Sequence, residues 1–480
     1  MKKLILAGLV VTPLAAYPAA SWLMGQQAER LLGEQYAQLE GNVYLKLHAR
    51  DTQRGVFNTV ETATFEWLPS IGKPLAQALC ESSAKAEGAP ACSNPTEPLR
   101  FTVRTTIQHG PLPGLSTLAL ATAHSELVLA EPRHPVLASL YGDKTPLTVD
   151  TVFRFGGDGH QSMKSPAVDF TADDQTRLQW GEFNLEGDFT RGAKSVRFTG
   201  GLPFVKALSP EGAPLLDMSD MRMEGTQTRL FDDDPYLYAG PVKLTLARLD
   251  MPRKGEDDQN VLIEGLAFRG NVIQKEAFLD LEGGYAVDVF RLGEERFGPV
   301  RLDAAFRHME ARSLSRFYRD YTRLVQDGDL REALAGGAKP DLALFKPLLE
   351  PARVLLENSP EFSIDRLDIT LPKGTLQGNA VVRLPNAKVG NLADAAANPL
   401  VLMGLASALE AEVRMSVPEA LAVEWAGEDQ AAMIPVLTQE GYIQNAGGVL
   451  SSRLSYARGE ITVNGKKLDP ALMGTVRGGE

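Results

Sequence analysis

The segment Tyr236–Leu249 reads YLYAGPVKLTLARL, and its second half alternates apolar with polar side chains. Successive side chains of a β-strand point to opposite faces, so this alternation predicts a strand with one apolar and one polar face. The same alternation, in full or with few exceptions, recurs in segments before and after this one in the chain. The other predicted strands are Leu147–Phe155, Val168–Phe170, Leu178–Phe189, Val196–Phe198, Val261–Phe268, Ala277–Phe290 and Val300–Phe306.

Short stretches rich in glycine and aspartate separate these predicted strands. Glycine adopts positive φ without strain and aspartate bonds to the nearby backbone, so both favour turns. The separators are Gly156-Gly157-Asp158-Gly159, Gly200-Gly201, Asp232-Asp233-Asp234-Pro235 and Gly283-Gly284. Many strands joined by short turns predict one long antiparallel meander.

Alternation also predicts strands before this run, between Val43 and Trp67 and from Phe101 to Ile107. An insertion rich in Pro, Ala and Ser lies between them, at residues 69–98. Within the first of these regions, Gly55 stands beside alternating apolar residues, which favours a β-bulge over a recognition patch.

Helical spacing of apolar residues appears only in the C-terminal part of the chain. It predicts an amphipathic helix from Ala311 to Val325 and further helical segments over Leu342–Leu356 and Leu392–Leu409, interrupted by prolines. Strands and hairpins alternate with these helices. The predicted fold class is therefore α+β, mostly antiparallel β, with several helices in the C-terminal half.

The N-terminus predicts a single transmembrane helix that precedes this fold. Lys2 and Lys3 are followed by a run from Leu4 to Gly25 without a charged side chain, close to the roughly 20 residues that span a bilayer. Positive flanks resist translocation, so the N-terminus is expected in the cytoplasm. A cleaved signal peptide is the alternative. The predicted anchor residues are Leu4, Ile5, Leu6, Leu9, Val10, Val11, Leu14 and Trp22.

These patterns divide the chain into four parts. Residues 1–25 are the anchor and residues 26–42 a helical stalk. Residues 43–310 form a β-rich region that carries the insertion, and residues 311–480 form a mixed α/β region that ends in a β-hairpin. The last two parts are expected on the far side of the membrane from the N-terminus.

Charge and cysteine content restrict the partners. The formal net charge of −12 and the lack of a basic run after the anchor argue against nucleic-acid binding. The only cysteines are Cys80 and Cys92, inside the insertion. Outside the cytoplasm they are expected to form a disulfide. Two free thiols are an alternative, and a metal pair is disfavoured because no second Cys or His pair stands at ligand spacing.

No stretch of the sequence forms an identifiable catalytic site. His109, His124 and His134 fall in one region, but their separations match no zinc-binding or helical spacing. No serine-hydrolase elbow or phosphate loop is present. We therefore expect no catalytic residues, metal or cofactor, and the sequence leaves the ligand-binding residues unknown. His109 is the candidate if the protein is an enzyme with a site assembled from distant residues.

Three motifs, taken in order after the lysine-flanked anchor, resemble the YdgA-type family of bacterial proteins. They are Arg54-Gly55-Val56-Phe57, His109-Gly110-Pro111-Leu112-Pro113 and Ser455-Tyr456-Ala457-Arg458-Gly459-Glu460-Ile461-Thr462-Val463-Asn464-Gly465-Lys466. The resemblance covers nearly the whole chain. It implies a single-pass protein of the bacterial inner membrane with its C-terminal bulk in the periplasm, and it assigns no molecular role. The cysteine-bearing insertion departs from the family pattern, so the resemblance does not imply the disulfide.

Two classes of function follow. The first is a binding or structural protein of the cell envelope that uses the apolar face of its sheet for lipid or for a protein partner. The second is the periplasmic enzyme described above. For the binding protein, two arrangements of the sheet are considered. In one the apolar face is open and holds a ligand, and in the other a second layer closes the core as a sandwich.

Overall fold

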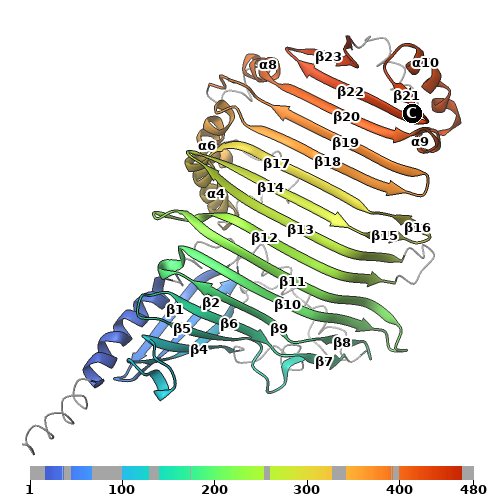
Figure 1. Ribbon diagram of the computed structural model, residues 1–480. Helices are drawn as coiled ribbons and strands as arrows, with labels where there is room; N and C mark the ends of the chain where they lie inside the picture. The colour runs from blue at the N-terminus through green and yellow to red at the C-terminus, as the bar shows by residue number, and fades with distance from the viewer. Residues whose placement is uncertain are drawn as a thin grey trace, which may run out of the picture. The chain divides into compact units, whose positions relative to one another are not determined.

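The structure is a computed structural model, and it describes residues 17–34, 36, 45–67, 100–128, 140–172, 174–252, 260–326, 342–390, 392 and 399–467. The chain divides into two compact units. Unit 1 comprises Met1–Val242 and Tyr321–Pro340, and unit 2 comprises Lys243–Asp320 and Asp341–Glu480. Each unit is built around an antiparallel meander (Figure 1).

In unit 1 each strand of the meander pairs antiparallel with the next. The order is β1 (Leu45–Arg54), β2 (Asn58–Trp67), β3 (Arg100–His109), β4 (Ala121–Val128), β5 (Thr148–Phe153), β6 (Gly159–Ser165), β9 (Phe183–Phe189), β10 (Ser195–Leu208) and β11 (Pro214–Phe231). The hairpin of β7 (Val168–Thr171) and β8 (Arg177–Trp180) pairs with the far end of β10. After β11 follows β12 (Asp234–Met251).

Unit 2 repeats this arrangement, again with antiparallel pairing from each strand to the next. The order is β13 (Val261–Lys275), β14 (Phe278–Val287), β17 (Val300–Glu310), β18 (Glu361–Leu371), β19 (Gly374–Arg383), β20 (Glu410–Pro418), β22 (Val449–Ala457), β23 (Glu460–Val463) and β24 (Lys466–Lys467). Three short strands extend it: β15 (Val289–Leu292) beside β13, β16 (Glu295–Phe297) beside β15, and β21 (Gln444–Ala446) beside β22.

The helices flank the sheets. Residues 17–34 form the N-terminal helix. The others are η1 (Pro113–Leu115), η2 (Arg191–Ala193), α4 (Ala311–Gln326), η3 (Leu342–Phe345), α6 (Lys346–Glu357), α8 (Pro399–Ala408), α9 (Glu419–Ala431) and α10 (Met433–Gln439). The predicted helix over residues 311–325 is confirmed. The predicted α+β class with a mostly antiparallel sheet is confirmed as well.

Two predicted turns were wrong. Gly200-Gly201 lies inside β10, and Gly283-Gly284 lies inside β14. A Cβ at Gly200 would collide with the backbone of Asn184 and Leu185 in β9, so this glycine allows two strands to approach closely. The alternation pattern does not predict β11. The polar run Thr226–Arg229 weakens the alternation there, and pairing with β10 orders the strand.

The main core of unit 1 lies between the N-terminal helix and the sheet. Its buried members are Ala28, Leu31, Leu32, Tyr36, Ala63, Phe65, Ile107, Leu120, Ala121, Ala123 and Phe153. Figure 1 shows the helix, in blue, beside the first strands. Residues 26–34, predicted as the start of a stalk, belong to this docked helix. In unit 2 a smaller core forms around Leu384, Ala387 and Val389 and contacts Leu356 of α6 and Leu405 of α8.

Candidate functional site

The strand register sorts the side chains of unit 2 onto two chemically different faces. Residues paired across a sheet point to the same side, so the ladders define rows. Three rows, which we call the apolar face, run across the meander. They are Phe268, Tyr285, Leu302, Leu367, Gly378 and Met415; Ala304, Ile364, Ala380, Val413 and Leu454; and Leu281, Phe306, Phe362, Val382, Ala411 and Tyr456. Val287 and Val300 continue this face at the next position.

Much of the apolar face contacts solvent. Tyr285 is 52% exposed and Phe306 is 51% exposed. Met415 and Leu454, on other strands of the same face, are also exposed. Aromatic rings pair along the rows, with ring centroids 4.9 Å apart for Phe268 and Tyr285 and 4.7 Å apart for Phe306 and Phe362. A second sheet layer would bury these side chains, so the face is open at Tyr285, Phe306, Met415 and Leu454.

The opposite side of the same strands, the charged face, carries ion pairs. Arg269 bonds Asp303 at 3.2 Å, Arg383 bonds Glu361 at 2.6 Å and Arg453 bonds Glu412 at 2.6 Å. These arginines are each matched by a carboxylate. Apolar side chains are thus concentrated on one face of the sheet and charged side chains on the other. The apolar rows therefore form a continuous surface and not isolated exposed residues.

His109, the candidate for a catalytic role, is 2% exposed. Its Nδ1 lies 2.9 Å from the carbonyl oxygen of Ser21, and its Nε2 lies 3.2 Å from Oγ1 of Thr59. The Ser21 hydroxyl donates to the His109 carbonyl at 2.6 Å. Burial lowers the pKa of the imidazole, although its hydrogen bond to Ser21 opposes this shift. With both ring nitrogens engaged and the ring buried, His109 connects the N-terminal helix to the sheet.

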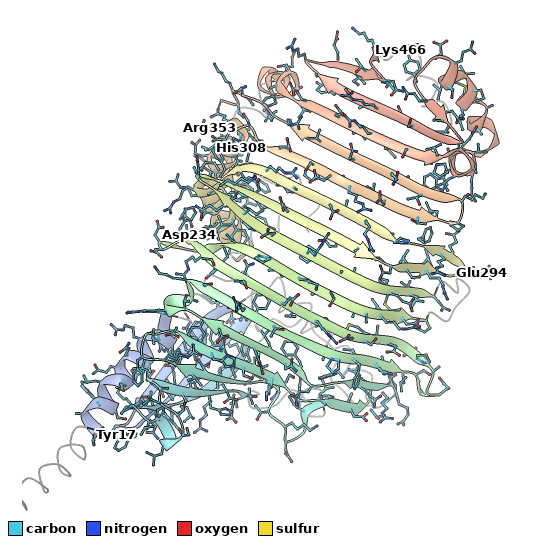
Figure 2. The ribbon with its side chains drawn as sticks, viewed as in Figure 1. Tyr17, Asp234, Glu294, His308, Arg353 and Lys466 are labelled. Carbon is cyan, nitrogen blue, oxygen red and sulfur yellow. The ribbon has the colours of Figure 1, made fainter. Side chains whose placement is uncertain are left out.

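The other motif residues near the N-terminus contact the same helix. Arg54 forms a two-pronged ion pair with Glu29, and the Tyr17 hydroxyl donates to the Leu112 carbonyl at 2.9 Å. Figure 2 labels Tyr17 on the N-terminal helix. Burial raises the pKa of Glu29, but hydrogen bonds from Arg54 and Thr59 outweigh it and hold that pKa below its usual value.

Gly55 is not a bulge, contrary to the expectation. It lies in the turn between β1 and β2, where its N–H donates to the Asn58 carbonyl at 2.7 Å. Phe57 in the same turn contacts the ring of Tyr17, with centroids 5.9 Å apart. After His109, Gly110 has φ 120°, and a Cβ there would collide with the Ser21 hydroxyl. Pro111 follows in the loop.

The motif residues at the C-terminus form turns and anchor helices in unit 2. Gly459 has φ 78° in the turn between β22 and β23, and Asn464-Gly465, with φ 49° and 81°, turns the chain into β24. The Asn464 amide donates at 3.0 Å to the carbonyl of Tyr442, which follows the C-terminal end of α10 in the chain. The Tyr456 hydroxyl donates to the Ala406 carbonyl of α8 at 2.9 Å. All of these contacts are structural.

Several predicted residues lie outside the described part of the chain: the anchor residues Leu4 to Leu14 and both Cys80 and Cys92. Trp22 is described and is 44% exposed on the N-terminal helix. Residues 17–25 of the predicted span already form part of the helix that contacts the sheet. Among the described helices, none is both long and apolar enough to cross a membrane.

Comparison with known proteins supports the resemblance inferred from the motifs. The profile of a family described as "Bacterial protein of unknown function (DUF945)" matches residues 1–471. The chain belongs to this family. It is also similar to Protein YdgA of Escherichia coli (strain K12), with 20% identity in an alignment 517 positions long that covers 97% of this chain and 95% of that protein. No solved structure matches the chain.

The motifs of this DUF945 chain therefore mark turns and contacts that hold helices to sheets, and of the apolar face they include only Tyr456, at the end of the third row. Sequence reasoning predicted that each strand has an apolar side. It did not identify the rows, because alternation within a segment does not say which residues of two strands are opposite each other. Bulges add to this difficulty: His308 has φ 59° where the register of β14 and β17 shifts.

Proposed function

We propose that this protein is a non-catalytic component of the bacterial cell envelope that holds lipid acyl chains on the apolar face of unit 2. In this proposal the uncharged N-terminal run that begins at Leu4 anchors it in the inner membrane and the bulk lies in the periplasm. The observation that carries the proposal is the exposure of aligned aromatic and aliphatic rows around Tyr285 and Phe306. Each exposed apolar side chain of these rows costs free energy in water, and exposed apolar patches often mark binding sites.

Acyl chains fit this face better than a polypeptide segment does. The side chains of the three rows are almost all hydrocarbon or aromatic and offer few hydrogen-bonding groups. An extended peptide lying on them would bury backbone N–H and C=O groups without partners, which costs free energy for each group. An acyl chain carries no such groups. The enzyme alternative loses support because its candidate, His109, is buried.

The acyl-chain assignment predicts a large effect of one substitution on the apolar face. Tyr285→Asp should leave the fold intact, because the position is half exposed, and should strongly reduce photo-cross-linking of a phospholipid with a diazirine-labelled acyl chain. A charge on the face raises the free energy of placing an acyl chain there. The measurements are circular dichroism for folding and mass spectrometry for captured lipid.

The control uses the neighbouring residue on the other side of the same strand. Ala286→Asp places a carboxylate on the charged face, opposite Arg301, and should leave cross-linking unchanged. Val287→Asp adds a test of the closed alternative, because unfolding by this change together with no captured lipid in the parent protein would favour a sealed sandwich. Equal lipid capture by Tyr285→Asp and Ala286→Asp would disprove the acyl-chain assignment.

The proposed anchor makes a separate prediction about topology. Alkaline phosphatase fused to the C-terminus is active only after export, so the fusion is expected to be active. The protein should also stay in the membrane pellet after carbonate extraction, because an uncharged run of this length partitions into the bilayer. A soluble species that begins near Ser21 would instead establish cleavage.

A further inference from the structure

Three connections leave the sheet of unit 1 at the same end, because the ends of the strands that they join are paired with one another. They are the turn after β1 (residues 55–57), the loop after β3 (residues 110–120) and the turn after β5 (residues 154–158). Backbone hydrogen bonds also join them. The His109 N–H donates to the Phe57 carbonyl at 3.0 Å, and the Leu120 N–H donates to the Phe153 carbonyl at 2.9 Å. We call the surface that these three connections form the loop end.

The loop end exposes large apolar side chains. Leu115 is 81% exposed and Leu118 is 72% exposed. The other exposed members are Val56, Phe57, Leu112 and Phe155. The first two connections contain no charged residue, and in the third Arg154 and Asp158 form an ion pair with each other at 3.0 Å. Exposed apolar patches of this kind mark contacts with a protein or a membrane.

The N-terminal helix begins at the loop end. The Tyr17 hydroxyl donates to the Leu112 carbonyl at 2.9 Å, and its ring centroid lies 5.9 Å from that of Phe57. Figure 2 labels Tyr17 at the start of this helix. Trp22 and Leu23, further along the helix, are exposed as well. Tyrosine and tryptophan are enriched where a protein meets the interface of a bilayer.

The sequence that precedes Tyr17 indicates which partner covers the loop end. Residues 4–16 contain no charged side chain, are mostly apolar and follow Lys2 and Lys3. This run is shorter than the roughly 20 residues that cross a bilayer. Apolar residues that flank a short membrane segment are therefore expected to enter the bilayer surface with it. A lipid bilayer is thus the apolar phase nearest to the loop end.

We infer that the loop end of unit 1 enters the surface of the lipid bilayer beside the anchor, through Leu115 and Leu118. Each exposed leucine gains free energy when it leaves water. Part of the backbone of this loop is already paired, because the N–H groups of Leu115 and Ser116 donate to the carbonyls of Leu112 and Pro113, which lowers the cost of entering lipid. The inference rests on the membrane anchoring proposed above and does not depend on the apolar face of unit 2.

The test is the quenching of a fluorescent label by lipid in the full-length protein, reconstituted into phosphatidylcholine vesicles. Cys80→Ser and Cys92→Ser remove the native thiols, and a nitrobenzoxadiazole label is attached at Leu115→Cys. Part of the phosphatidylcholine carries bromine on its acyl chains and quenches labels that contact those chains. The label at residue 115 should be strongly quenched, and its emission should shift to shorter wavelength.

The matched control is Val128→Cys in the same background. Val128 is an exposed apolar residue at the opposite end of β4, and its label should not be quenched. A label at Val56→Cys should be quenched, and should lose most of this quenching when Leu115→Asp and Leu118→Asp are introduced, because charged side chains oppose entry into lipid. Circular dichroism should show an unchanged fold, since both leucines are exposed.

Equal quenching of the labels at residues 115 and 128 would overturn the inference, and so would unchanged quenching at residue 56 in the aspartate variant. A protein that does not float with the vesicles in a density gradient would overturn the inference together with the proposed anchoring. Lipid capture by the apolar face is measured separately. Tyr285→Asp should leave the quenching at residue 115 unchanged, so loss of lipid capture alone would concern unit 2 only.

Discussion

Replacing Gly25 with leucine is expected to detach the N-terminal helix from the sheet of unit 1. A Cβ at Gly25 would lie 2.8 Å from the imidazole atoms Cε1 and Nδ1 of His109. That ring is held at both nitrogens, so it has no free position to adopt. Overpacking of a filled core costs about 1 to 3 kcal/mol, and a leucine should reach about 3 kcal/mol. For units of this size, the melting temperature would fall by about 6 to 12 °C.

Thermal unfolding followed by circular dichroism measures this effect, and two further variants make it specific. Gly404→Leu in α8 is the control, because no described atom lies within 4 Å of a Cβ at that helical position. Gly25→Ala should lower the melting temperature of the parent protein but should not lower it in the His109→Ala background, where the ring is absent. If Gly25→Ala lowers the melting temperature equally in both backgrounds, the contact between residue 25 and the histidine ring is not the cause of the destabilisation.

The second large effect is expected from Arg50→Met. Glu61 is completely buried, and its Oε2 accepts a hydrogen bond from Arg50, while Oε1 has no partner among the described residues. Removing one member of a buried ion pair costs about 3 to 5 kcal/mol because the other charge stays buried without compensation. Arg50 is 33% exposed, so we expect the low end, about 3 kcal/mol. Urea unfolding measures this change.

A second substitution separates the charge effect from lost packing. Arg50 also lies over the ring of Tyr36, with Cζ 5.5 Å from its centroid. Burial raises the pKa of Tyr36 to about 12, so the phenol stays neutral near pH 7 and does not add a second charge. Arg50→Met together with Glu61→Gln should recover most of the lost stability. No recovery would mean that the ring contact, and not the carboxylate, dominates.

The candidate site was only partly predictable from the sequence. Alternation around Val287 and Val300 predicts an apolar side for each strand. The two glycine pairs at Gly200 and Gly283 look like turns because glycine is common in turns, yet both lie inside strands, and Gly200 allows close approach of the neighbouring strand. The loop position of His109 suggests exposure, but the helical residues 17–34 bury it, and they lie far earlier in the chain.

The sequence by itself determined the fold class, the antiparallel meander and the helix over residues 311–325, because local periodicity and turn chemistry depend only on neighbours in the chain. The motifs also determined family membership. The tertiary structure alone decided the register that aligns Tyr285 with Leu302 and Phe306 with Phe362. It also decided that His109, Arg54 and Glu29 meet at one helix. Such contacts join residues far apart in the chain, and their energies depend on burial and pairing that no local pattern encodes.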